Sequence, residues 1–289
     1  MRDLSWDGYP NCRDLGGLPT ASGARTQYGR IARGPRRELL SPAGWAAARA
    51  WGLRTVVDLR CPYETGAQPG DPEQTDPGEV AVVSSPTEDH TNEEFRRVCF
   101  PILDSPAYWP HQVEILPGML RDTLVRVAQA RPGILVHCSA GRDRTGLVCA
   151  LLLATAGVAA ELIADDYATS VRVMAQVASH SPTADQHQGR SPEQVEQWVG
   201  QTRPLVLDFV AATDRHLAAI GLQPAVRDRL RTLLLAPAPR LDEAVVKNGW
   251  LYPTQVPLHR EEEDRGYSEA AEPPRRRRRS STPQPALQR

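Results

Sequence analysis

The segment from His137 to Gly146 carries the residue types that covalent phosphoryl chemistry requires. Cys138 supplies a thiol, and Arg144 follows it six residues later. A thiolate is a strong nucleophile, and a planar guanidinium can donate to two phosphoryl oxygens, which orients the group for in-line attack and stabilises the transition state. We therefore predict Cys138 and Arg144 as catalytic residues.

The backbone between these two residues is expected to form an anion cradle. A buried strand should end at Cys138 and a buried helix should begin near Thr145, so free N–H groups and the positive end of the helix dipole converge there and favour a thiolate. Gly141 lets the backbone approach closely. His137 should fix the Cys138 backbone by hydrogen bonding, and the Thr145 hydroxyl can donate to the departing sulfur. The predicted phosphate- or substrate-binding residues are Ser139, Ala140, Gly141, Arg142 and Thr145.

Hydrolysis also needs a proton donor. The leaving oxygen must be protonated and a water must then be activated, so a nearby carboxyl group should act first as an acid and then as a base. Asp143, inside the loop, is the first candidate. Asp58 is the second, because it stands at the carboxyl end of a neighbouring strand, where parallel sheets bind ligands. The sequence does not decide between them, and weaker candidates are Asp104, Asp165 and Asp166.

The elements around the loop predict an α/β fold with a central, mainly parallel sheet flanked by helices. Residues 54–59 and 134–136 are rich in β-branched side chains and are expected to be buried strands. Residues 1–40 indicate turns and short strands, and residues 68–86 indicate a long loop. Helices are expected at about 41–51, 92–98, 116–127, 145–156, 160–177, from Ser191 onward, 205–220 and 224–235.

Composition divides the chain into a body and a tail. We predict one domain over residues 1–236 and a Pro/Arg-rich, mostly disordered tail over 237–289, with a polar insertion at 181–190. The net charge of −1 includes five arginines at 275–279, which leaves the remainder near −6. The body is therefore not expected to bind nucleic acid specifically, whereas Arg275 to Arg279 can give weak contact with an anionic membrane.

The cysteines indicate a reducing compartment. Five of them, at 12, 61, 99, 138 and 149, form no CxxC pair and no zinc spacing, so no metal and no cofactor is predicted. The first residues lack the apolar segment of a signal peptide, and the longest nearly apolar run, 147–160, is too short for a typical membrane span. We expect a cytoplasmic protein, although export by a signal-independent route leaves no such mark.

Three motifs together resemble a known family. The strings Asn11 to Gly17, Asp58-Leu59-Arg60 with Glu64 after it, and His137 to Gly146 are similar to those of the bacterial tyrosine/serine protein phosphatases of the atypical dual-specificity type. The similarity extends over about residues 4–236 and includes the string Ala164 to Tyr167. It implies a protein-tyrosine-phosphatase-like fold. It also implies a supporting role for Arg13 and Asp14, which would brace the phosphate loop through hydrogen bonds.

Two positions depart from the family pattern. Cys12 stands where the family has Phe, and Arg142 stands where it has a Lys associated with loops that also accept phosphoinositides. The resemblance implies activity on phosphotyrosine, phosphoserine or phosphothreonine, and on inositol lipids, and Arg142 leaves the lipid part open. Arg142 is either a substrate contact or an ordinary solvated loop residue.

The predicted function is phosphomonoester hydrolysis through a cysteinyl-phosphate on Cys138, with protein phosphotyrosine as the first substrate class. The alternative is a phosphate- or phosphoinositide-binding module with weak turnover, which the complete set of loop residues argues against. A sulfurtransferase or arsenate reductase would use the same thiolate, but no paired resolving cysteine stands near Cys138.

Overall fold

A single mixed sheet organises the protein. The computed structural model describes residues 2–177 and 190–235, and within them five strands follow the spatial order β1-β2-β5-β3-β4. β2, β5, β3 and β4 are parallel, and β1 pairs with β2 in the antiparallel direction. The strands are β1 (Arg13–Asp14), β2 (Ile31–Gly34), β3 (Thr55–Asp58), β4 (Ala81–Ser84) and β5 (Ile134–His137). The predicted mainly parallel sheet is confirmed.

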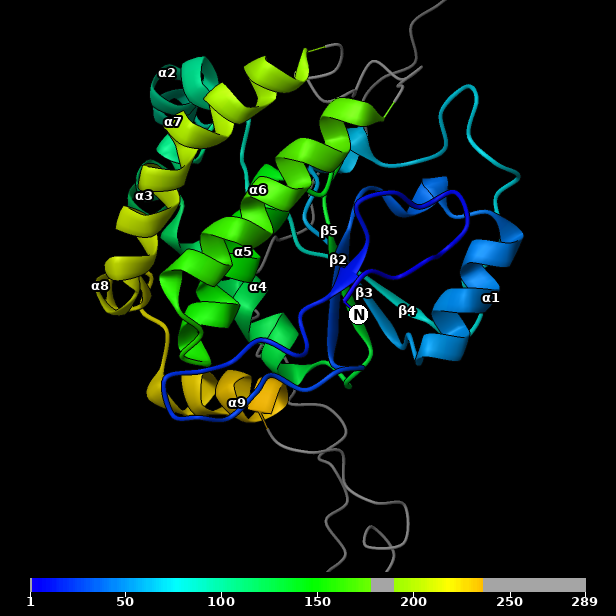
Figure 1. Cartoon of the computed structure of the whole chain (residues 1–289), viewed down its shortest axis with the longest axis horizontal. Coiled ribbons are helices and arrows are strands. Elements are labelled where there is room, and N and C mark those ends of the chain that lie inside the picture. Colours follow the sequence, from blue (N-terminus) through cyan, green and yellow to red (C-terminus); the bar gives the residue numbers. More distant parts are fainter. Residues whose placement is uncertain (1, 178–189, 236–289) are drawn as a thin grey trace, which may run out of the picture. The chain divides into compact units, whose positions relative to one another are not determined.

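The two faces of the sheet bury different cores. Helix α1 (Pro42–Trp51) covers one face alone, and the other helices gather on the opposite side (Figure 1). Successive strand residues point to opposite faces, so Val56 packs toward α1, whereas Val57 packs toward the larger helical core. Both faces are covered, which explains why the inner strands read as continuous apolar runs.

The helices of the larger core surround α5. Nearly every side chain of α5 from Leu147 to Leu153 is buried, as expected for a helix that is apolar all round. The predicted capping box at Ser191 is present, because its hydroxyl accepts from the Gln194 N–H. The helices are α2 (Glu93–Cys99), α3 (Trp109–Ile115), α4 (Pro117–Gln129), α5 (Asp143–Thr155), α6 (Ala160–Gln176), α7 (Pro192–Ala211), α8 (Thr213–Ala219) and α9 (Pro224–Leu235).

Four sequence-based expectations differ from the structure. The expected loop 68–86 contains β4, whose largely exposed side chains gave little burial signal although its backbone pairs with β3. The helix expected at 205–220 is the end of α7 followed by α8, because α7 packs along α6 and continues through Pro204. Helix α3 was not expected, and α5 begins at Asp143, two residues earlier than expected.

Two predicted features lie outside the described residues. The insertion expected at 181–190 falls there except for its last residue, and so does the whole tail 237–289 with the arginines at 275–279. The division at residue 236 therefore stays a prediction.

Candidate active site

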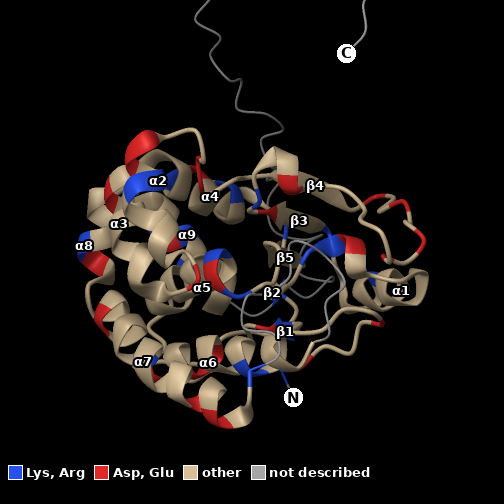
Figure 2. Ribbon diagram, turned by 90° about the horizontal axis from the view of Figure 1, so that it is seen from above, with Lys and Arg blue, Asp and Glu red and all other residues tan. Residues whose placement is uncertain are grey.

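The predicted phosphate loop joins β5 to α5 at the carboxyl edge of the sheet. β5 ends at His137 and α5 begins at Asp143, so Cys138 is the first loop residue. Gly141 has a φ of +69°, which side chains rarely adopt, and a Cβ there would lie 2.4 Å from the carbonyl oxygen of Gly34 at the end of β2. The glycine therefore allows the loop to cross the end of the neighbouring strand. In Figure 2, charged segments gather where these strand ends approach α5.

The carbonyl groups of the loop face donors on the protein side. The Cys138 carbonyl accepts from His137 Nδ1 at 3.0 Å, and the Ser139 carbonyl accepts from the Arg36 N–H at 2.8 Å. The next three carbonyls accept from Asn11 for Ala140, from Asn11 and Arg33 for Gly141, and from Arg33 and the Gly146 N–H for Arg142.

The opposite sides of these peptides are available to a ligand. Within the described part of the chain, the N–H groups of Ala140, Gly141 and Asp143 have no hydrogen-bond partner. Buried N–H groups normally have partners, so a set without them at a helix start is suited to an anion. The loop therefore has the geometry that the sequence predicted for a phosphate cradle.

Two side chains that sequence reasoning did not assign to the site hold the loop from outside. Asn11 Nδ2 lies 3.1 Å from the Ala140 carbonyl oxygen and 3.3 Å from that of Gly141, and Arg33 Nη2 lies 2.7 Å from the same Gly141 oxygen. Asn11 stood in a motif that carried the family resemblance, which was the available signal. Arg33 had none, because an arginine at a strand end is usually a surface residue.

These side chains belong to a buried ionic cluster centred on Asp166. Asp166 accepts from Arg13 Nε at 2.8 Å, from Arg2 Nη2 at 2.6 Å and from Arg33. Burial alone would raise the pKa of Asp166, but the arginines outweigh it and hold the pKa well below the usual range. Asp166 therefore remains ionised and does not suit the role of general acid. Arg13 reaches the loop only through Asn11, whose Oδ1 accepts from Arg13 Nη1 at 2.7 Å.

Two other aspartates serve different places. Asp14 accepts from the Gly16 N–H at 2.7 Å, the Gly29 N–H at 2.8 Å and Trp51 Nε1 at 3.0 Å. Its hydrogen bonds thus hold N-terminal turns and α1 together, and the expected direct bracing of the phosphate loop by Asp14 is not seen among them. Asp165, a weaker acid candidate, is exposed and pairs with an arginine of α7.

Asp58 is tied to a buried arginine behind the loop. It accepts from Arg60 Nε at 2.9 Å and from Arg60 Nη2 at 2.7 Å, and its Oδ2 lies 3.6 Å from His137 Nε2. Burial alone would raise the pKa of Asp58, but the neighbouring His137 ring and the Arg60 guanidinium lower it to about 2. Asp58 therefore has almost no proton to donate at neutral pH.

Arg144 is held by two carboxylates. Glu64 takes it end-on, with Nη1 at 2.5 Å and Nη2 at 2.7 Å, and Glu88 Oε2 lies 3.6 Å from Nη1. Glu64 ends a short 3-10 helix (Pro62–Glu64) and also accepts from the Cys61 N–H at 2.9 Å. The end-on pairing does not use the Nε edge of the guanidinium, so that edge can donate to a phosphoryl group while Glu64 fixes the orientation.

Asp143 is oriented by neighbours on two sides. Arg142 Nε lies 2.9 Å from its Oδ2, and the Tyr167 hydroxyl donates to its Oδ1 at 2.8 Å. Arg142 Nη2 lies 3.4 Å from the carbonyl oxygen of Asp104. The Arg142 side chain is only 3% exposed, whereas that of Asp143 is 17% exposed. The alternative that Arg142 is a solvated loop residue is therefore wrong.

The thiols are all free and buried. Burial raises the pKa of Cys61, Cys99 and Cys149 to about 11 in each case, so these three remain neutral thiols at neutral pH. Beside Cys138 in the loop, the Thr145 hydroxyl is fully buried and has no hydrogen-bond partner in the described residues. It is free to donate to a group that enters the loop.

An aromatic surface adjoins the Arg144 side of the loop. Tyr63 is 68% exposed and Phe100 is 42% exposed, and His90 lies between them. The Tyr63 hydroxyl and His90 Nδ1 share a hydrogen bond, and His90 Nε2 lies 3.0 Å from Glu88, which in turn pairs with Arg144. We call Tyr63, His90 and Phe100 the aromatic rim.

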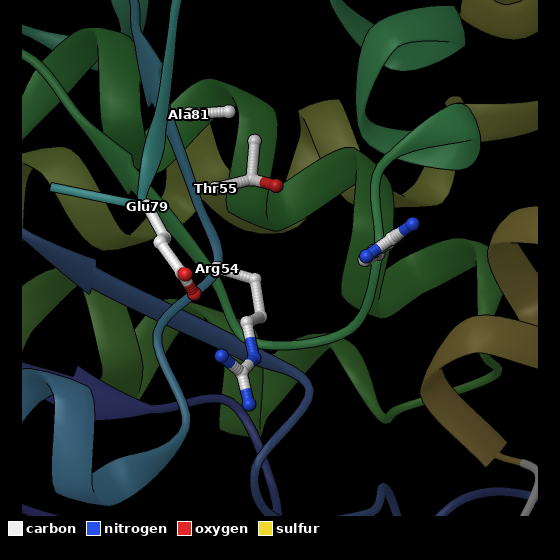
Figure 3. Close-up of a pocket in the computed structure, with 5 residues that line it drawn as sticks. Arg54, Thr55, Glu79 and Ala81 are labelled. Carbon is white, nitrogen blue, oxygen red and sulfur yellow. The ribbon is translucent and has the colours of Figure 1, made fainter.

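A separate hollow lies at the other end of the sheet. It has a volume of about 570 Å³ and is lined by Arg54, Thr55, Glu79, Ala81 and Arg131 (Figure 3). Thr55 and Ala81 are the first residues of β3 and β4, whereas the phosphate loop follows the last residue of β5. The hollow is therefore distinct from the candidate active site.

The fold and the loop together define a class of protein. A parallel sheet whose central strand leads into Cys138, followed by a loop with outward carbonyls and an arginine in the first turn of a buried helix, is the architecture of cysteine-based phosphate-loop proteins. The chain belongs to the tyrosine phosphatase family, whose sequence model matches residues 4–236.

Curated relatives carry related names. The chain is 32% identical over 190 residues to protein H16_A0669 of Cupriavidus necator, whose name places it among the tyrosine-protein phosphatases, with 58% of this chain and 63% of that protein covered. It is 29% identical over 187 residues to the triple specificity protein phosphatase PtpB of Mycobacterium tuberculosis, with 55% and 66% covered. The chain thus spans less than two thirds of the length of these relatives.

Among solved structures, the core catalytic domain of the PP-IP phosphatase SIW14 from S. cerevisiae, in complex with citrate, is 12% identical, with 69% of this chain and 96% of that chain covered and a TM-score of 0.32. In residues 2–177 and 190–235, none of the helices combines the length and the apolar character that crossing a bilayer requires. The same residues hold no cluster of three or more His, Cys, Asp or Glu side chains suited to a metal ion.

Proposed function

We propose that this chain hydrolyses phosphotyrosine in proteins through a cysteinyl-phosphate on Cys138. The observation that carries the proposal is the loop that begins at Cys138, with its carbonyls bonded outward and the N–H groups of Ala140, Gly141 and Asp143 left for an anion. A dianionic phosphoryl group fits such a cradle at the start of α5. Membership of the tyrosine phosphatase family supports the same activity.

The first step transfers the phosphoryl group to sulfur. The Cys138 thiolate attacks phosphorus, so an S–P bond forms while the P–O bond to the substrate breaks in line. Arg144 donates to two equatorial oxygens and stabilises their charge. Asp143 gives its proton to the leaving oxygen, because among the carboxylates considered it is the one inside the loop that reaches solvent, whereas Asp58 is ionised and buried.

The second step releases phosphate. Asp143, now ionised, takes a proton from a water that attacks phosphorus, the S–P bond breaks, and the electron pair returns to sulfur. The Thr145 hydroxyl donates to the sulfur as it leaves, which gives its otherwise unpaired O–H a partner. His137 supports both steps by holding the Cys138 carbonyl away from the anion.

The aromatic rim supports phosphotyrosine over phosphoserine. Tyr63 and Phe100 expose large aromatic faces two polar contacts away from Arg144, and a substrate ring can stack on such faces, whereas a serine side chain cannot. An aromatic contact of about 1 kcal/mol corresponds to roughly a fivefold preference. Tyr63→Ala should therefore lower kcat/KM for a phosphotyrosine peptide about fivefold and leave a phosphoserine peptide unchanged. Tyr28→Ala, which removes another exposed tyrosine, is the control.

A substrate panel and two cysteine variants test the activity. The full chain is assayed with phosphotyrosine, phosphoserine and phosphothreonine peptides and with phosphoinositides. Cys138→Ser should still bind inorganic phosphate but hydrolyse none of them, whereas Cys99→Ser, which also removes a buried thiol, should keep turnover. Turnover by Cys138→Ser would exclude the cysteinyl-phosphate.

The remaining proposals concern the ends of the substrate range and of the chain. A binding module without turnover would give phosphate binding and no hydrolysis in the same panel. Residues 1–236 are proposed as the phosphatase domain. Attachment of Arg275 to Arg279 to anionic lipid vesicles is a separate proposal, and removing residues 237–289 should leave hydrolysis of a small aryl phosphate intact.

A further inference from the structure

We propose that Asn11 and Arg33 are positioning residues that set the direction in which the peptides of the phosphate loop point. The inference rests on the proposed function, because it concerns the same anion site. A peptide unit that directs its N–H to an anion must direct its C=O the other way, so the outward carbonyls need donors. Asn11 and Arg33 supply side-chain donors to the carbonyls of residues 140–142.

The orientation of the Asn11 amide is fixed by its other partner. Arg13 has only donors, so the Asn11 atom that lies 2.7 Å from Arg13 Nη1 must be the oxygen. The NH2 group then faces the carbonyls of Ala140 and Gly141. Asn11 also has a φ of +54°, a left-handed conformation that asparagine tolerates better than most residues. The backbone thus directs this side chain toward the loop at a local conformational cost.

Arg33 divides its guanidinium between an anion and the loop. Its Nη1 pairs with Asp166, and its Nη2 lies 2.7 Å from the Gly141 oxygen and 3.4 Å from the Arg142 oxygen. A charged donor draws these carbonyls more strongly than a neutral one. Because Arg33 is 1% exposed, it cannot swing out to water instead.

Both routes meet at Asp166. One runs from Asp166 through Arg33 to the loop, and the other runs through Arg13 and Asn11. Three arginines, Arg2, Arg13 and Arg33, surround this single carboxylate, so the cluster carries a formal excess of positive charge beside the anion site. The cluster is therefore placed to orient the loop and to attract its ligand.

Two substitutions at Asn11 separate the positioning role from a merely structural one. Asn11→Gly removes the amide and keeps the left-handed backbone accessible. Asn11→Asp keeps an acceptor for Arg13 but turns an acceptor toward the two loop carbonyls. The dissociation constant of inorganic phosphate is measured by calorimetry on the full chain, together with Tm. We expect Asn11→Gly to weaken phosphate binding about tenfold, and Asn11→Asp to weaken it further while Tm stays near that of the wild type.

A matched pair of arginine substitutions tests the other route. Arg33 and Arg2 both pair with Asp166, but within the described residues only Arg33 also donates to the loop carbonyls. Lysine keeps the charge and loses the fork that spans two acceptors. Arg33→Lys should therefore weaken phosphate binding about tenfold, and Arg2→Lys should change it less than about twofold.

The outcomes distinguish this inference from the proposed function. Wild-type phosphate affinity in folded Asn11→Asp and Arg33→Lys proteins overturns the positioning role, and so does a wild-type chain that binds no phosphate. If the wild type binds phosphate, the variants bind it weakly and no phosphomonoester is hydrolysed, the positioning role stands and the proposed catalytic function fails.

Discussion

Replacing Asp143 with Asn tests which carboxylate is the general acid. At about pH 7, a group with a pKa of about 2, such as Asp58, is protonated in only about one molecule in 10⁵, which is too few to serve as an efficient proton donor. General acid catalysis typically contributes about 10²- to 10⁴-fold to the rate. We therefore expect Asp143→Asn to lower kcat for phenyl phosphate by about 10²-fold or more.

The leaving group gives this experiment its discrimination. Nitrophenolate departs without help from a proton, so Asp143→Asn should slow p-nitrophenyl phosphate by less than about tenfold. Asp58→Asn should affect both substrates equally, because Asp58 acts only through Arg60 and His137 on the geometry of the loop. Steady-state kcat is measured with both substrates across pH, with Tm and phosphate affinity as checks on folding.

The opposite pattern would refute the reasoning. If Asp58→Asn slowed phenyl phosphate far more than p-nitrophenyl phosphate, and Asp143→Asn slowed both alike, the proton would come from Asp58. The low pKa of Asp58 and the solvent-facing position of Asp143 would then have been misinterpreted.

Three further predictions follow from the contacts of the site. Glu64→Gln should lower kcat/KM for an aryl phosphate about tenfold, because it weakens two charge-assisted hydrogen bonds that orient Arg144, whereas Glu94→Gln, on an exposed face of α2, should leave steady-state rates unchanged. Arg142→Lys should lower kcat for phenyl phosphate severalfold with little change in KM, since it loosens the hydrogen bond to the acid; if phosphoinositide turnover alone changes, Arg142 contacts the head group instead. The folded-state pKa of Asp58 is lowered from 3.8 to about 2, so its stabilisation is present above about pH 4 and lost as the pH falls through about 2. Acid unfolding should cost the wild type about 2 kcal/mol more than Asp58→Asn over this window, and identical pH dependence of the two proteins would contradict it.

The local parts of the fold were predictable because short-range signals determine them. Ser41 and Pro42 begin α1, the Ser191 capping box begins α7, and the β-branched run before Cys138 forms β5. The missed elements depend on tertiary context. β4 exposes most of its side chains and is a strand only because β3 provides its ladder partners, and α7 continues through Pro204 because it packs along α6.

The candidate site divides in the same way. Cys138, Asp143 and Arg144 are neighbours along the chain, so their spacing was readable. The partners of the loop come from far away in sequence: Asp166 lies 133 residues from Arg33, and Glu64 lies 80 residues from Arg144. Sequence patterns assign arginines to the surface by default, so their burial here carried no local signal.

The buried ionic cluster also suggests why stability and activity should separate in this protein. Removing two charges from water costs about as much as their attraction returns, so pairs such as Arg33 with Asp166 add little net stability, and apolar side chains of similar volume can replace them without loss. An apolar side chain cannot donate to the carbonyl of Gly141, however. A variant repacked with apolar residues at this cluster can therefore keep the Tm of the wild type and still lose its affinity for phosphate, because the peptides of the loop would no longer be held with their N–H groups toward the anion.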